Sequence, residues 1–171
     1  IGLPIPNGNV TIRGEGAASV LAPYDDDTPY IFKIGNDSAD VSDVTLELMS
    51  LRLPRDGDAV VVEGQGGSDI TLRYLVLEGA NDSSFNYAIQ AEDPDFSGIE
   101  ISGCEMRPVT ALPLSVEGMD GITVAGNHMP YQPYRADQFR GEDAVDTAIR
   151  LSQAAYPVGE IPAGIILWPV S

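Results

Sequence analysis

Acidic side chains are the most numerous groups in this sequence that could do chemistry, with 26 Asp and Glu residues. Two groups of them are close along the chain: residues 25–27 with Asp56 and Asp58, and Glu92 with Asp93 and Asp95. Carboxylate oxygens bind Ca²⁺, and two carboxyl groups can flank a glycosidic bond. Asp93 and Asp95 are therefore the candidate metal ligands, with Ca²⁺ as the expected ion. A solvated acidic loop is the competing interpretation, and no cofactor is required.

The sequence offers few other reactive groups. His128 is the single histidine, which excludes sites that need two imidazoles from one chain. Cys104 is the single cysteine, so the chain has no internal disulfide. It stands between apolar neighbours, and we expect a buried thiol that packs as a small hydrophobic group. We predict no catalytic residue and do not expect an enzyme.

Aromatic residues in loop-like stretches are candidates for stacking against a sugar ring. Tyr24, Tyr131 and Tyr134 are the expected carbohydrate-binding residues. The competing interpretation is that each tyrosine packs against its own scaffold.

The net charge of −17 excludes several classes of partner. Such a surface repels phosphate backbones and anionic lipids, so we expect no nucleic-acid binding. The apolar stretch 161–170 is broken by Pro162 and is too short for membrane insertion. High salt would screen the self-repulsion, which suits a marine or halophilic source. An ordinary acidic extracellular surface explains the charge equally well.

A short phrase recurs along the chain: a turn residue, an apolar residue, Thr or Glu, and a second apolar residue. Its five copies begin at Asn9, Asp43, Asp69, Gly98 and Gly121. A second short apolar strand precedes each phrase, and the last inward residues of these strands are Ile5, Ile34, Val62, Ala91 and Val116. A third strand follows the phrase, and its inward pairs are Leu51/Leu53, Leu75/Leu77, Cys104/Met106 and Asn127/Met129.

Three short strands that recur in a fixed order predict a solenoid, because one coil cannot bury its apolar face until another stacks on it. The expected fold is an all-β, right-handed parallel β-helix of about five coils over residues 1–129. A β-sandwich is the alternative, but it gives no reason for a three-strand phrase to repeat in order.

Residues 6–16, Pro-Asn-Gly-Asn-Val-Thr-Ile-Arg-Gly-Glu-Gly, and the later stretches 58–64 and 68–73 resemble the pectate-lyase-like right-handed β-helix proteins. The resemblance covers about residues 3–129 and implies the fold. That group includes pectin and alginate enzymes, phage tailspikes and purely structural proteins. The acid–base phrases of its enzymes are missing here: His128 stands in Gly-Asn-His-Met, and 93–95 is Asp-Pro-Asp.

Residues 130–171 depart from the repeat. Residues 142–155 predict a helix with a narrow face of small residues, which could cap the solenoid or pack in a trimer. Residues 157–171, Pro-Val-Gly-Glu-Ile-Pro-Ala-Gly-Ile-Ile-Leu-Trp-Pro-Val-Ser, resemble the entry to a phage tail collar domain. An extended apolar tail packing along the solenoid is the alternative for this segment.

Together these features favour a structural or adhesive segment of a viral tail fibre or tailspike. It would be a homotrimer in contact with other virion tail proteins, located in the virion or outside the cell, and would present loops to a host-surface glycan. One alternative is a polysaccharide lyase, hydrolase or epimerase of the same fold, and another is a non-viral extracellular repeat protein.

Overall fold

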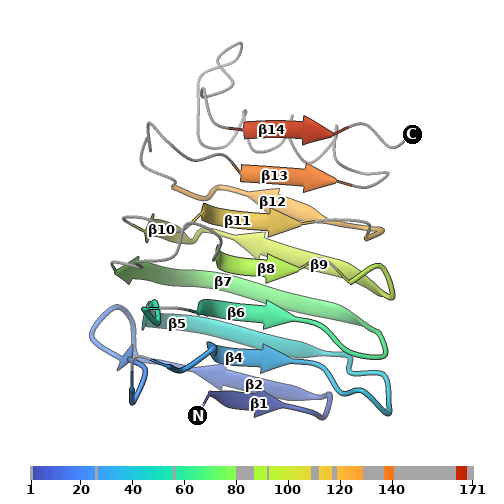
Figure 1. Ribbon diagram of the computed structural model, residues 1–171, viewed down its shortest axis with the longest axis horizontal. Coiled ribbons are helices and arrows are strands. Elements are labelled where there is room, and N and C mark those ends of the chain that lie inside the picture. Colours follow the sequence, from blue (N-terminus) through green and yellow to red (C-terminus); the bar gives the residue numbers. More distant parts are fainter. Residues whose placement is uncertain are drawn as a thin grey trace.

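The computed structural model describes residues 2–25, 27–55, 57–79, 87–91, 93–108, 112–116, 119–128, 137–140 and 165–168. Every secondary-structure element in these residues is a strand, and all the paired strands run parallel. The chain is an all-β parallel solenoid, with strands stacked one above another from the N-terminal to the C-terminal end (Figure 1). The prediction of an all-β parallel solenoid is confirmed. The right-handed winding and the count of about five coils stay predictions.

Two sheets form the walls of the solenoid. Sheet A contains, in spatial order, β1 (Leu3–Ile5), β4 (Tyr30–Ile34), β6 (Asp58–Val62), β8 (Tyr87–Ala91), β11 (Leu112–Val116), β13 (Asp137–Arg140) and β14 (Ile165–Trp168). Sheet B contains β2 (Val10–Arg13), β5 (Val44–Arg52), β7 (Gly67–Gly79), β9 (Phe96–Ser102) and β12 (Thr123–Ala125). In addition, β3 (Val20–Leu21) pairs with β5, and β10 (Glu105–Pro108) pairs with β7.

The register of sheet A follows the repeat. Ile5, Ile34, Val62, Ala91 and Val116 are successive Cα partners across five strands. In sheet B, Val10 pairs with Val44, Val44 with Ile70, and Ile70 with Ile99. The expected core positions Val44, Leu46, Val62, Ile70, Leu72, Ile99, Ile101, Ile122 and Val124 are all buried. The side chain of Val116 lies outside the described residues.

A left-handed residue divides each long strand of sheet B into two halves. Leu48 in β5 has a φ of 56°, and its neighbour Tyr74 in β7 has a φ of 54°. The buried positions change phase at this residue, from Val44 and Leu46 to Met49 and Leu51. The first half of β5 pairs with β2, and its second half pairs with β3. Likewise, the first half of β7 pairs with β9, and its second half pairs with β10. Because of this left-handed residue, side chains from both halves of the strand are buried in the same core.

One sequence prediction is wrong by two residues. We expected Leu51 to stack on Leu75, but Leu51 pairs with Leu77, and Met49 pairs with Leu75. Leu53 lies beyond the end of β5, where its amide donates to the carbonyl of Glu78 at 2.9 Å. Met49, Leu51 and Leu53 are apolar at alternate positions, so the pattern alone did not decide which two of them stack on Leu75 and Leu77.

The C-terminal segment adds strands to sheet A. Strand β13 pairs in parallel with β11, and β14 pairs with β13 (Figure 1). The helix predicted over 142–155 lies outside the described residues, as do Met129, Tyr131 and Tyr134. Among the described residues, no helix is long and apolar enough to cross a membrane.

Candidate functional site

A pocket of about 490 Å³ opens on the outer surface of the solenoid where sheet A ends. Its lining combines acidic, amide and apolar groups. The residues are Asp37, Val61, Val62, Glu63, Gly64, Gln90, Asp93 and Pro94. The pocket is open to solvent and offers both polar and apolar groups to a small ligand.

The parallel stack explains why three carboxylates gather there. Asp37 follows β4, Glu63 follows β6, and Asp93 follows β8. These three strands are neighbours in sheet A, and their carboxyl ends lie at the same edge. Residues that are about thirty positions apart in sequence therefore come together, as the repeat predicts.

One cation balances part of this acidic edge. Lys33 Nζ lies 2.7 Å from Glu63 Oε1 and 4.0 Å from Asp37 Oδ1. The hydrogen bond to Glu63 raises the pKa of the Lys33 amine above its ordinary value, and the negative charges of Glu63 and Asp37 act in the same direction. The pocket has more acids than cations, so its field favours a neutral or cationic ligand.

Asp93 has a structural role at this edge. Its Oδ2 accepts a hydrogen bond from the Gly64 amide at 3.0 Å, and its Oδ1 accepts one from the Asp95 amide at 3.1 Å. The first bond ties one coil to the next, and the second closes a tight turn. Within the described residues, no group of three or more His, Cys, Asp and Glu side chains could hold a metal ion. Glu92 lies outside those residues, and a Ca²⁺ site at Asp93 and Asp95 stays a prediction.

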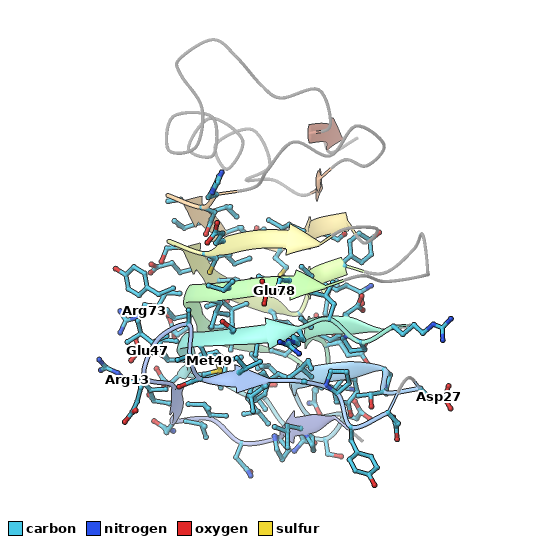
Figure 2. All side chains as sticks on the ribbon, turned by 90° about the vertical axis from the view of Figure 1, so that its left-hand side faces the viewer. Arg13, Asp27, Glu47, Met49, Arg73 and Glu78 are labelled. Atoms are coloured by element: carbon cyan, nitrogen blue, oxygen red, sulfur yellow. The ribbon has the colours of Figure 1, made fainter. Side chains whose placement is uncertain are left out.

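The other acidic group lies elsewhere. Asp25 Oδ1 accepts a hydrogen bond from the hydroxyl of the buried Thr28 at 2.6 Å, so Asp25 stabilises its own turn. Asp27 is exposed and stands on the opposite side of the solenoid from the charged column of Arg13, Glu47 and Arg73 (Figure 2). Asp26 and Asp56 lie outside the described residues.

Of the three tyrosines predicted to bind carbohydrate, the structure describes Tyr24. Its side chain is 93% exposed. The ring is accessible to a ligand, and it does not line the pocket at the edge of sheet A. Its predicted role therefore stays open.

The single cysteine and histidine sit near each other in the stack. Cys104 is buried, and burial raises the pKa of its thiol to about 11. The buried Asn127 occupies the next coil, where its side-chain amide accepts from the Cys104 amide and donates to the Ile101 carbonyl, both at 2.8 Å. His128 Nδ1 lies 3.5 Å from Glu105 Oε1 on the exposed side. The expected packing role of Cys104 agrees with this burial.

Sequence reasoning missed a second polar cluster, on the outer face of sheet B. Arg13, Glu47 and Arg73 are successive Cα partners on β2, β5 and β7, and their side chains form a column (Figure 2). The Glu47 carboxylate lies 3.5 Å from Arg13 Nη1 and 2.6 Å from Arg73 Nε. Each residue occupies the fourth position after the start of its phrase, so the repeat itself could have revealed the alternating charges.

No protein-family model matches the chain, and no curated protein or solved structure shows significant similarity to it. The fold is thus established by the strand register, and the resemblance to pectate-lyase-like proteins and to a collar entry stays a prediction.

Proposed function

We propose that this chain is a structural and adhesive segment of a viral tail fibre or tailspike. In this proposal it is a right-handed parallel β-helix of about five coils, assembled as a homotrimer with other tail proteins, and it presents its outer surface to a host glycan. The supporting observation is the uninterrupted register of buried rows along the stack. Such a core needs only the inward residues, so a rigid rod can vary its outer surface for recognition.

The pocket at the edge of sheet A is the surface best suited to that role. It offers carboxylate acceptors in Asp37 and Glu63, a polar amide in Gln90, and apolar surface in Val61 and Pro94. Saccharides present hydroxyl donors and apolar C–H faces, and sites for small ligands commonly join these two kinds of group. The acidic lining disfavours a polyuronate ligand.

Electron microscopy of the native particle that carries this chain tests the assignment, with an antibody against the chain as label. We expect label on a tail fibre or tailspike. Sedimentation equilibrium of the full chain should give a mass three times 18.2 kDa. Label on a cell surface in uninfected cultures, or a stable monomer at micromolar concentration, would contradict the proposal.

A glycan-cleaving enzyme is the second candidate, because Glu63 and Asp93 come from adjacent coils and line one pocket. Two carboxyl groups on either side of a bond are the arrangement that glycosidases use. A reducing-end assay over a panel of neutral and acidic polysaccharides distinguishes the two functions. Turnover that disappears in Glu63→Gln but persists in Glu15→Gln, a control at an exposed glutamate outside both proposed sites, would favour the enzyme.

A further inference from the structure

Tyr74 is an exposed aromatic residue on sheet B, away from the pocket at the edge of sheet A. It lies in β7 and is 56% exposed. It directly follows Arg73, the upper member of the charged column in Figure 2. An accessible ring beside fixed charged groups is a frequent arrangement in ligand recognition.

The backbone holds this ring at a cost. Tyr74 has a left-handed φ of 54°, which is unfavourable for a bulky residue. The equivalent residues of the next two coils are Gly103 and Gly126, with φ of 60° and 63°. Glycine adopts this conformation without penalty, so the corner does not need an aromatic side chain. Leu48, the equivalent residue of the preceding coil, has a similar φ of 56°, so the left-handed conformation belongs to the corner, and the exposed ring is what sets Tyr74 apart.

Gly103 fixes the position of the ring. A Cβ atom at residue 103 would lie 2.8 Å from both Cδ1 and Cε1 of Tyr74. The ring therefore lies against the backbone of the next coil, where any larger residue would displace it. A ring that is already fixed loses little conformational entropy when a ligand stacks on it.

Charged groups next to the ring are also fixed. Arg73 Nε donates to Glu47 Oε2 at 2.6 Å, and only 6% of the Glu47 side chain is exposed, against 45% for Arg73. The buried carboxylate thus holds an accessible guanidinium in place. On β9, Ser102 is the Cα partner of Arg73, and its hydroxyl donates to Glu100 Oε1 at 2.7 Å.

We propose that Tyr74, Arg73 and Glu100 form a binding site for a neutral pyranose unit of an oligosaccharide. The sugar's C–H face stacks on the Tyr74 ring, and its hydroxyls hydrogen-bond to the guanidinium and to the Glu100 carboxylate. Neutral sugars fit because Glu47 pairs with both Arg13 and Arg73 and Glu100 adds a second negative charge on the neighbouring strand β9, while the chain's charge of −17 repels polyanions. The inference extends the proposed glycan display to a second face, and it requires neither a virion nor a trimer.

Calorimetric titration of the full chain tests this site with cellohexaose, mannohexaose and an oligogalacturonate. We expect a neutral hexasaccharide to bind with a dissociation constant that is unchanged between low salt and 0.5 M NaCl. Salt screens interactions between charges, and this ligand carries none. Tyr74→Ala should weaken it at least about tenfold, in line with stacking energies of aromatic side chains, whereas Tyr74→Phe should keep it. Leu3→Ala is the control, because the Leu3 side chain is 51% exposed, close to the 56% of Tyr74, and lies on sheet A outside the cluster.

Tyr74→Gly separates binding from folding, since it introduces the residue that the next coil already carries. It should lose binding while its thermal midpoint stays equal to or above that of the parent chain. Binding that survives in both Tyr74→Ala and Tyr74→Gly, binding of the oligogalacturonate alone, or no binding of either neutral sugar would overturn the proposal. These outcomes are separate from the sedimentation and microscopy results that test the tail-fibre assignment.

Discussion

Single residues at the corners determine how this chain folds back on itself. The first residues of the five phrases, Asn9, Asp43, Asp69, Gly98 and Gly121, all have left-handed φ between 57° and 68°. Asn, Asp and Gly are the residues that tolerate this conformation, so this column could be predicted from sequence. A second column of left-handed residues consists of Leu48, Tyr74, Gly103 and Gly126. It could not be predicted from sequence, because its first two members are Leu48 and Tyr74, which are not typical turn residues. The available signal was the change of phase in the apolar pattern five residues into each phrase.

Cys104 gives a prediction at this scale. Burial raises the pKa of its thiol from 9.0 to about 11, so the folded state keeps the proton that the unfolded chain loses. Stability should therefore fall as pH rises from about 9 to 11, by an amount on the order of 2 kcal/mol. Urea denaturation across that range measures the fall, which Cys104→Ala should lack.

Thiol labelling provides an independent check on the same residue. At pH 8 the native chain should react with a disulfide reagent far more slowly than the urea-unfolded chain, because the thiolate is the reacting form. Rapid labelling of the native chain would show that Cys104 is accessible, contrary to its 1% exposure.

Among the elements, the strands of sheet B owe their pairing to buried rows inside and to charge alternation outside. The inward rows could be predicted, since each phrase repeats the same two apolar positions. The outer column of Arg13, Glu47 and Arg73 could also have been found, because each residue is the fourth after the start of its phrase, and the register confirms that the three face one another. The two-residue error at Leu51 arises because residues 48–53 are compatible with two registers.

The charged column predicts an order of destabilisation. Arg73→Met removes the closer partner of the buried Glu47 carboxylate and should lower the urea midpoint most. Arg13→Met removes the partner at 3.5 Å and should cost less. Glu47→Gln removes the buried charge and leaves two solvent-accessible arginines, so it should cost least. Equal midpoints for the three variants would show that the column contributes nothing to stacking.

At the scale of the whole molecule, the repeat predicted the architecture but not the surface sites. Stacking places Asp37, Glu63 and Asp93 at one edge, although each appeared in the sequence as an ordinary loop acid. The sequence candidates Asp93 and Asp95 came from proximity along the chain, whereas the pocket is built from residues one coil apart. Positions outside the buried rows need not repeat, so the sequence gave no means of telling which tyrosines are exposed, as Tyr24 and Tyr74 are.

Engineered disulfides test the stacked register, on which both proposed binding surfaces depend. In a Cys104→Ala background, Thr45→Cys with Thr71→Cys joins two direct Cα partners on β5 and β7. Adjacent strands are about 4.8 Å apart, within the range a disulfide spans, and strands two coils apart are separated by roughly twice that distance. Intact mass after oxidation and thiol labelling should show a cross-link in this pair and none in the control pair of Thr45→Cys with Glu100→Cys. A cross-linked control together with a fully reduced Thr45/Thr71 pair would contradict the parallel solenoid.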